Sequence, residues 1–333
     1  MAKKSSTKRE FDWRSYTKPP RLLSPEQESA LLEGILSPLL ELTRSRDDLR
    51  MEIRSRQAAF YCLGTLVLRV RGAEEPFVAE IDANVRLPRA ERVGAEQLET
   101  WPLASPEDVA RCVAEMAALC DLTAGFSDDE APVPERAVLH AFADANSSPD
   151  GDLMVIDTEY QYGKRRFDFV AMKRAEGVAG PGGFTTPRFV VGQLKSAPRP
   201  LGGTSGLAVY ASDFAEFARA LGGTHLAKAK EELAELFAQK QRLGLVSTDI
   251  PLRHLTEDDP EYLVVLAGFS AGDEALDPPL IEMHEKIVTR HYRPELLRLA
   301  SVENPAHADD LRLTADDMMT YREFKGYRKR LRG

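Results

Sequence analysis

The sequence LMVIDTEYQYGKRRFDFVAMKRAEGVAGPGGFTTPRFVVGQLKS, at residues 153–196, decides the fold. Its first part, up to Tyr162, is rich in Val, Ile and Tyr and predicts a strand, because such side chains pack well in sheets. Gly163-Lys164 makes a tight turn into RRFDFVAMKR, so we expect the first two strands to form a hairpin. A loop rich in glycine and proline then leads to RFVVGQLKS, the third strand.

Further elements flank these three strands and define the fold class. A short helix is expected at 135–145, and helical patterns fill 207–221 and 224–243. Residues 261–269, EYLVVLAGF, are almost all apolar, which is typical of a strand buried on both faces of a mixed sheet. The order α-β-β-β-α-β predicts an α/β core with a mixed central sheet, in a chain that is α+β overall.

The N-terminal part is expected to form a smaller α+β module. Ser24, followed by Pro25 and by Gln27, predicts a helix start and a helix over 25–43. Strand-like runs between residues 50 and 87 predict a small antiparallel sheet, and Ser105-Pro106 opens a second helix.

Four segments follow from these patterns. The acidic, proline-containing stretch 127–132 is typical of a linker and places the module boundary there. We therefore expect a flexible basic arm at 1–21, a recognition or interaction module at 22–126, the main domain at 133–300, and a tail at 301–333 with a C-terminal helix that is capped at Thr314 and has a basic end.

The amino-acid composition limits the class of protein to which this chain can belong. The chain has 333 residues, of which 43% are hydrophobic and 29% charged, and such a chain can bury a core. We find no long apolar run and no secretory signal, which predicts a cytoplasmic protein without a membrane span. Its three cysteines, Cys62, Cys112 and Cys120, include no CxxC pair, so neither a disulfide scaffold nor a cysteine-bound zinc is expected.

The distribution of charge favours a polyanionic partner despite a net charge of -9. Residues 1–21 carry seven basic and two acidic side chains, 157–199 carry eight and four, and 321–333 carry six and one. Local potential guides a polyanion more than net charge does. The second of these segments also contains the strands described above.

Three side chains on adjacent strands could perform chemistry. Gln193 and Lys195 are two apart on one strand and so point to the same face, and Asp168 on the neighbouring strand can reach the same place. A carboxylate, an amide oxygen and an ammonium group suit phosphodiester hydrolysis assisted by Mg²⁺ or Mn²⁺. The alternative is a solvated sheet face with no chemical role.

With these residues and this order of elements, residues 134–269 resemble the PD-(D/E)XK nuclease superfamily in a D...QxK form. VIDTEYQY, RRFDFVAM and RFVVGQLKSAPRPLGGTSGL are similar to a poorly characterised bacterial branch of it. The resemblance implies a restriction-endonuclease-like core and a metal held by Asp168, by Gln193 and by the backbone carbonyl of Leu194. Lys195 would then activate or position water.

Several candidates remain open within this interpretation. Most members of the superfamily have an acid where this chain has Gln193, and the amide should weaken metal binding. The additional acid of the family corresponds to Glu135, with Asp157 and Glu159 as rivals. The basic turn formed by Lys164, Arg165 and Arg166 could contact phosphates or be an exposed turn without a partner.

Two hypotheses about function follow. The first is an Mg²⁺-dependent nuclease, an enzyme that hydrolyses nucleic acid, with DNA favoured over RNA, in bacterial restriction or anti-phage defence. The second is an inactive nuclease-fold module that binds nucleic acid or a partner protein within a larger complex. A homodimer is a further expectation, because most nucleases that cut both strands need two active sites.

Overall fold

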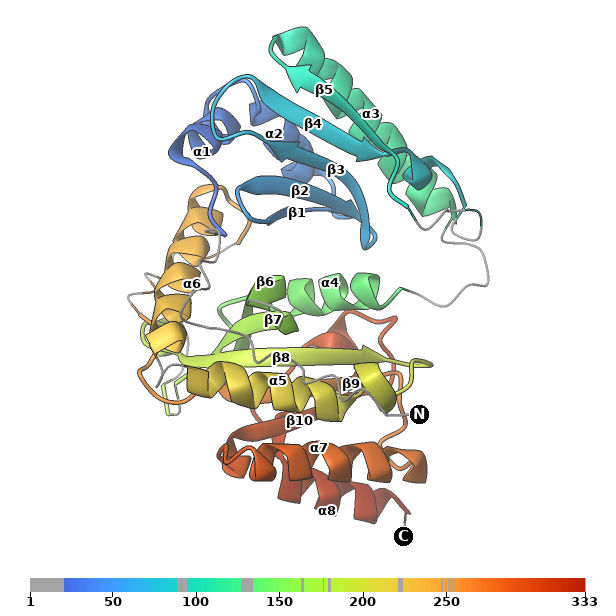
Figure 1. The fold of residues 1–333 in the computed structure, drawn as a ribbon, viewed down its shortest axis with the longest axis vertical. Coiled ribbons are helices and arrows are strands. Elements are labelled where there is room, and N and C mark those ends of the chain that lie inside the picture. Colours follow the sequence, from blue (N-terminus) through green and yellow to red (C-terminus); the bar gives the residue numbers. More distant parts are fainter. Residues whose placement is uncertain are drawn as a thin grey trace, which may run out of the picture.

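The computed structural model contains two β-sheets with helices packed around them, a mixed α/β fold (Figure 1). It describes residues 21–88, 91, 95–126, 134–162, 165–175, 177–178, 181–220, 224–246, 248, 250, 252 and 254–332. The predicted linker and Lys164 therefore lie outside the described residues. None of the helices in this part of the chain is both long and apolar enough to cross a lipid bilayer.

The N-terminal sheet is an antiparallel meander. Its strands are β1 (Leu49–Ile53), β2 (Gln57–Cys62), β3 (Thr65–Arg71), β4 (Phe77–Asp82) and β5 (Leu98–Leu103), paired in chain order. The predicted small antiparallel sheet is confirmed, although β5 was not expected. Helices α1 (Pro25–Leu32), α2 (Ser37–Ser45) and α3 (Pro106–Gly125) pack around this sheet.

The first predicted helix, 25–43, is wrong in one respect, because α1 and α2 are separate. Ser24 caps α1 as expected, with Gln27 completing the capping box. The chain then turns tightly at Gly34, where a Cβ atom would lie 2.7 Å from the Cα of Ala30. Pro38 stands in the first turn of α2 and suits a new helix start.

The second sheet is mixed, as predicted. Its order is β11-β10-β9-β8-β7-β6, where β6 (Leu153–Tyr162), β7 (Arg165–Lys173) and β8 (Arg188–Ser196) are antiparallel neighbours. Strands β8, β9 (Glu261–Ala267) and β10 (Leu297–Val302) run parallel, and β11 (Met319–Thr320) pairs antiparallel with β10. The register places Phe169 opposite Gly192, so Asp168 lies beside Gln193.

Helices cover both faces of this second sheet. Helix α4 (Glu135–Ala145) packs through Phe142 and Val138 against one face. Helix α5 (Leu207–Arg219) covers the other face, where Phe214 stacks on Tyr262 at a centroid distance of 4.6 Å. Helices α6 (Thr224–Arg242), α7 (Asp277–Thr289) and α8 (Tyr321–Arg332) complete this part of the molecule.

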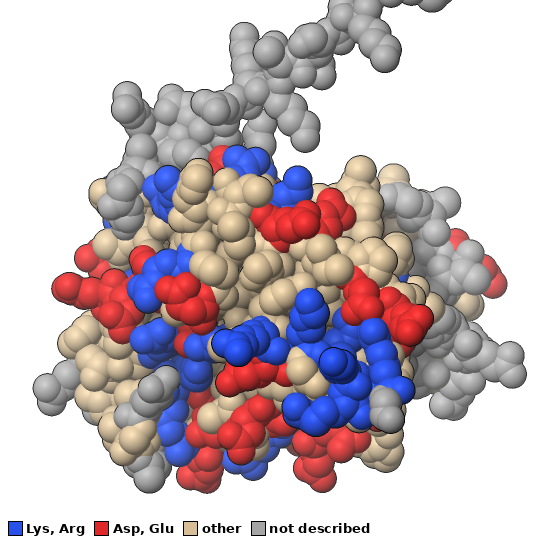
Figure 2. All heavy atoms as spheres, turned by 90° about the horizontal axis from the view of Figure 1, so that it is seen from below, with Lys and Arg blue, Asp and Glu red and all other residues tan. Residues whose placement is uncertain are grey.

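The C-terminal helix is shorter than predicted. Helix α8 begins at Tyr321, and Thr320 caps it by accepting a hydrogen bond from the backbone N–H of Glu323. Thr314 and Asp317 bond to each other in a separate turn, so the expected cap at Thr314 was wrong. Figure 2 shows the face at the end of the molecule formed by α7 and α8, where lysine and arginine side chains gather on one side. This basic surface lies away from the space between the two sheets (Figure 1).

Helix α6 joins the two sheets. It runs beside both of them in Figure 1, and its C-terminal end contacts the N-terminal part of the chain. Gln239 accepts a hydrogen bond from the backbone N–H of Leu23 at 2.9 Å. One hydrophobic cluster contains Leu31 and Phe60 together with Leu236 and Phe237. The two predicted modules are therefore packed against each other through a shared core.

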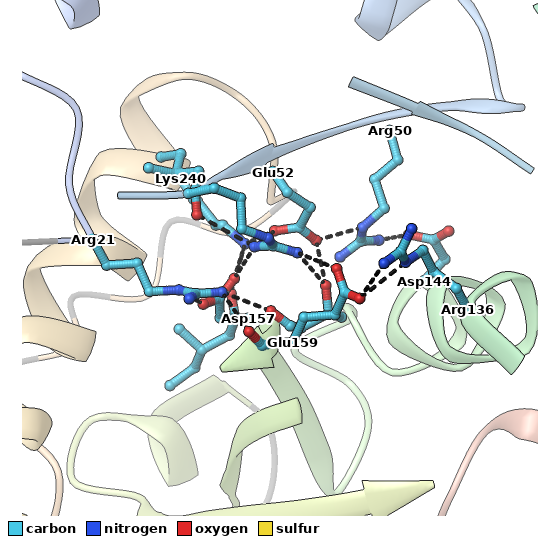
Figure 3. A network of polar contacts seen from close by, with 12 residues as sticks. Arg21, Arg50, Glu52, Arg136, Asp144, Asp157, Glu159 and Lys240 are labelled. Atoms are coloured by element: carbon cyan, nitrogen blue, oxygen red, sulfur yellow. Dashed lines mark hydrogen bonds and ion pairs between the residues drawn. The ribbon is translucent and has the colours of Figure 1, made fainter. Parts of the chain in front are cut away.

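A buried network of charges lies at this junction (Figure 3). Glu52 of β1 and Asp157 of β6 are completely buried, and Lys240 of α6 lies between them, 2.7 Å from the Glu52 carboxylate and 3.5 Å from that of Asp157. Arg54 contacts the same two acids, at 3.3 Å and 2.9 Å. Burial alone would raise the pKa of Glu52, but the charges of Lys240, Arg50 and Arg54 outweigh it and hold that pKa well below its usual range.

Arg21 belongs to this network as well. Its side chain is buried, forms an ion pair with Asp157, and donates a hydrogen bond to the carbonyl oxygen of Thr158 at 2.8 Å. We expected a flexible arm over 1–21, but Arg21, the last residue of that segment, is part of the folded structure. The remaining residues of the predicted arm lie outside the described part.

A second contact fixes the N-terminal sheet to α4. Gly64, in the turn between β2 and β3, has a φ of +77°, and a Cβ atom there would lie 2.5 Å from the backbone nitrogen of Ala137. Only glycine allows this turn to lie directly on the first turn of α4. The two sheets are thus joined at two separate places, and the space between these places contains the site described below.

The network predicts a large effect for Lys240→Met, which keeps the apolar stem and removes the charge. Glu52 and Asp157 would remain buried with one cation fewer, so we expect unfolding by urea to show a loss of about 3–5 kcal/mol in the free energy of unfolding. Arg242→Met is the matched control on the same helix. It breaks a half-exposed ion pair with Glu28 and should cost less than about 1 kcal/mol. Equal losses for the two variants would contradict this account of the junction.

Candidate functional site

Strands β7 and β8 bring together the three residues that the sequence singled out. Asp168 accepts hydrogen bonds from the side-chain amide of Gln193 and, at 2.9 Å, from the backbone N–H of Leu194. Lys195 follows on the same face of β8, and its charge acts on Asp168. The side chains of residues 168 and 195 therefore lie on one side of the sheet, as their spacing predicted.

Gln193 has an unusual environment for an amide. Its side chain is only 1% exposed, and its NH₂ group is used by Asp168. Its oxygen Oε1 is buried and has no hydrogen-bond partner among the described residues. A buried polar atom without a partner destabilises a protein, so this oxygen needs an explanation.

Lys195 lies beneath the surface of the site. Its side chain is 6% exposed, and Nζ lies 3.8 Å from Oε1 of Glu135, at the start of α4. The same Nζ sits 4.5 Å from the centre of the Tyr210 ring on α5, a cation–π contact. The other oxygen of Glu135 lies 3.0 Å from Nε of Arg199. Glu135, the first of the three candidate acids, is thus adjacent to the strand residues.

The carboxyl group of Asp168 is strongly perturbed. Burial raises its pKa from 3.8 to about 7, while the Leu194 N–H and the Lys195 charge oppose that rise. The charges of Glu135 and Glu159 raise it further. Desolvation is therefore the main reason that this carboxyl group holds a proton near neutral pH.

The rival acids on β6 have different surroundings. Asp157 is completely buried among the cations of the junction, so its role is structural. Glu159 lines the same cavity as Asp168, but its carboxylate accepts two hydrogen bonds from Arg136, at 2.9 Å and 2.7 Å (Figure 3). Its φ of +49° is uncommon for a residue other than glycine. Glu159 acts on Asp168 through its charge.

A cavity of about 1080 Å³ opens above these residues, between the N-terminal sheet and the second sheet. Asp168, Leu194, Glu135 and Tyr210 form part of its wall on the side of the second sheet. The remaining wall is rich in arginine, and its guanidinium groups come from Arg21, Arg54, Arg69, Arg136, Arg166 and Arg199. The wall also carries acids, and among the described residues all of these arginines except Arg166 form ion pairs with carboxylates. The exposed Arg166 is therefore the arginine best placed to meet a phosphate group.

The described residues of the predicted basic turn have two different roles. Arg166 is exposed and lines the cavity, where it can contact a phosphate. Arg165 instead forms ion pairs with two acids of α5, Asp213 at 2.6 Å and Glu216. Its assignment to nucleic-acid binding is therefore not supported by its contacts. Lys164 lies outside the described residues.

Sequence reasoning missed the contribution of the N-terminal sheet. Arg54, Gln57, Tyr61 and Arg69 all line the cavity, although they precede Asp168 by about a hundred residues. Two guanidinium groups approach the ring of Tyr61, that of Arg54 at 5.8 Å and that of Arg136 at 5.6 Å from the ring centre. The alternation of basic and apolar residues in TLVLRVR was the one available signal, and it did not indicate which face would meet the site.

The donor atoms fit a hard divalent cation with few protein ligands. Among the described residues, no group of three or more His, Cys, Asp and Glu side chains could hold a metal ion. Mg²⁺ needs only one or two carboxylates because it keeps several waters. Asp168, the orphaned oxygen of Gln193 and Glu135 would meet that need. Leu194 was expected to offer its carbonyl, but the contact seen here uses its N–H.

The raised pKa of Asp168 predicts a change in stability with pH. Between about pH 4 and pH 7 the folded protein retains a proton that the unfolded chain has lost, so this group makes the free energy of unfolding fall as pH rises. Asp168→Asn should therefore gain on the order of 1–3 kcal/mol relative to the unmodified protein at pH 8 and little at pH 4. Urea unfolding at pH 4 and at pH 8 measures this gain in the free energy of unfolding. Asp316→Asn, at an exposed position, is the control. Parallel curves for Asp168→Asn and the unmodified protein would show that the carboxyl group is not perturbed.

The arrangement places two carboxylates on the wall of one cavity, with a buried ammonium group and a buried amide oxygen beside them. These properties come from the contacts of Asp168, Gln193, Lys195 and Glu135 and from the surrounding arginines. Comparison with known proteins gives no further information about these properties. No family model, no curated protein and no solved structure matches this chain.

Proposed function

We propose that the protein is a metal-dependent nuclease that hydrolyses phosphodiester bonds in nucleic acid, with DNA favoured over RNA. The observation that supports this most is the position of Lys195. Its buried ammonium group lies beside Glu135 and shares a sheet face with Asp168, and these two acids line the cavity. A lysine kept among carboxylates in this way can act on a phosphate or on its attacking water.

The finer fold assignment belongs to the same proposal. The order α4-β6-β7-β8-α5-α6-β9, with the first strands antiparallel and β8 parallel to β9, is compatible with a restriction-endonuclease-like core. The resemblance to the PD-(D/E)XK superfamily, a role in bacterial restriction or anti-phage defence, a cytoplasmic location and a homodimer remain expectations from the sequence.

Each residue would have a separate task. Asp168, Gln193 and Glu135 would hold Mg²⁺ or Mn²⁺, and a metal bound there would polarise a phosphate oxygen and lower the pKa of a bound water. Lys195 would orient the attacking water or offset the negative charge that grows on the phosphate. Tyr210 keeps that ammonium group in place. Arg166 and Arg199, on the rim of the cavity, would position neighbouring phosphates.

Cleavage of DNA in the presence of Mg²⁺ tests the proposal. Lys195→Ala should lower the rate at least a hundredfold, because it removes the buried ammonium group that lies beside Glu135 and acts on Asp168. Lys173→Ala is the matched control, since Lys173 is a mostly buried lysine of the adjacent strand that pairs with Glu261 instead. Cleavage by Lys195→Ala at the unmodified rate would rule out the assigned site.

The second candidate function, an inactive nuclease-fold module that binds nucleic acid or a partner protein, is favoured by a specific contact. The amide of Gln193 donates to Asp168 and so satisfies the carboxylate without any metal. A protein of this kind would bind DNA through the same arginines and never cut it. Binding in EDTA without cleavage in Mg²⁺ would favour this alternative.

Gln193→Glu separates the two candidates. In an active nuclease the added carboxylate would strengthen metal binding, so the Mg²⁺ concentration for half-maximal cleavage should fall several-fold. Without metal the same variant should be less stable, because two carboxylates would then face each other. In an inactive module no cleavage would be seen at any Mg²⁺ concentration, and an unchanged Mg²⁺ requirement in an active one would remove Gln193 from the metal ligands.

A further inference from the structure

We infer that the cavity accepts a single nucleic-acid strand, or the unpaired end of a duplex, and excludes intact duplex DNA. This inference rests on the proposed function, which it deepens by naming the form of the substrate. It follows from three features of the cavity. They are its size, the fixed position of its two walls, and the origin of its arginines.

The size of the cavity limits what can reach Asp168. The cavity has a volume of about 1080 Å³ and lies between two walls, so Asp168 is approached from within a confined space. One B-DNA major groove alone is about 12 Å wide. A duplex is wider than the groove it contains. A single strand, whose bases are free to turn away from its phosphates, can pass through a narrower space.

The two walls are held at a fixed separation. On one side the Gly64 turn lies on Ala137 so closely that a Cβ atom would not fit. On the other side Lys240 and Arg54 join Glu52 of the N-terminal sheet to Asp157 of the second sheet. Opening the cavity for a duplex would require breaking one of these contacts, and buried ion pairs are costly to break.

The arginines face the cavity from both sides. Arg54 and Arg69 come from the N-terminal sheet, whereas Arg136, Arg166 and Arg199 come from the second part of the chain. Cations on opposite walls can surround one phosphate backbone, while a duplex lying on an open basic face would meet cations on one side only. Guanidinium groups also stack on exposed bases, and Arg166 is an exposed guanidinium group of this wall.

The basic surface at helix α8, outside the cavity, is not placed to bring nucleic acid to Asp168. Helix α8 carries an excess of Lys and Arg, but it lies at the far end of the molecule from the N-terminal sheet (Figure 1). Two of its arginines, Arg328 and Arg332, pair with Asp277 of α7. A duplex bound near α8 would not present a phosphodiester bond to Asp168.

Binding to labelled oligonucleotides tests the inference directly. Fluorescence anisotropy in EDTA would compare a 12-nucleotide single strand of mixed sequence with the 12-base-pair duplex made from it. We expect the single strand to bind at least tenfold more tightly. Equal or tighter binding of the duplex would overturn the inference, as would failure of the protein to bind either oligonucleotide.

Two variants of β3 locate the binding to the cavity. Arg69 lines it and Arg71, two residues further on the same strand, lies outside its wall. Arg69→Ala should weaken binding of the single strand at least fivefold and Arg71→Ala less than twofold, after thermal melting has shown that both variants are folded. Equal effects of the two substitutions would overturn the location of the strand in the cavity.

Cleavage then separates this inference from the proposed function. In Mg²⁺ the single strand and a duplex with a single-stranded overhang should be cut, the latter within its overhang. Cutting inside the blunt duplex as fast as the single strand would overturn the inference and leave the nuclease intact. No cutting of any substrate, together with a tenfold preference for the single strand in binding, would reject the nuclease and retain the inference about the cavity.

Discussion

The buried ion network between the two sheets is the constraint on which the rest of the structure depends. Glu52 and Asp157 are taken completely out of water, and charged groups are tolerated there only when they are paired and hydrogen-bonded. Their cations come from three different places in the chain, namely Lys240, Arg54 and Arg21. A change in the relative position of the sheets would leave at least one of these charges without a partner. The network therefore fixes the cavity, and the cavity determines what can approach Asp168.

The surroundings of Asp168 explain why its pKa is raised. Asp168 is partly buried on the cavity wall, and desolvation by the surrounding protein is the main cause of its raised pKa. Glu135 and Glu159 approach from different elements and add to the effect. Each of these two acids has a cationic partner, because Arg136 pairs with Glu159 while Lys195 and Arg199 pair with Glu135. The spacing on β8 thus places Lys195 where its charge acts on both Glu135 and Asp168.

Local patterns in the sequence were enough to predict the strands and the residues that share a face. The alternation along β8 predicted that Gln193 and Lys195 point the same way, and the hairpin predicted that Asp168 lies beside them. Helix α4 was predicted over its observed residues, Glu135–Ala145. These features depend on interactions between neighbours in the chain or in a hairpin, which a sequence pattern records.

What was missed depends on contacts between distant residues. Glu52 and Lys240 are separated by 188 positions, and nothing in either local sequence marks them as partners. Strand β5 escaped notice because its residues, LETWPL, are mostly exposed and show no alternation. The role of Asp157 as an interface acid, in contrast to Glu135, likewise follows only from the packing of β6 under the N-terminal sheet.

Gln193 shows how these constraints meet at one side chain. The site already contains three carboxylates, and the charges of Glu135 and Glu159 add to the desolvation that raises the pKa of Asp168. An acid at position 193 would add a fourth charge in direct contact with Asp168, which burial makes costly in the absence of metal. The amide avoids that cost and donates a hydrogen bond to Asp168, yet it leaves its own oxygen buried and without a partner among the described residues. The hydrogen bond to Asp168 and the orphaned oxygen therefore have opposite effects on stability, and an acid at this position would replace both with a charge beside Asp168.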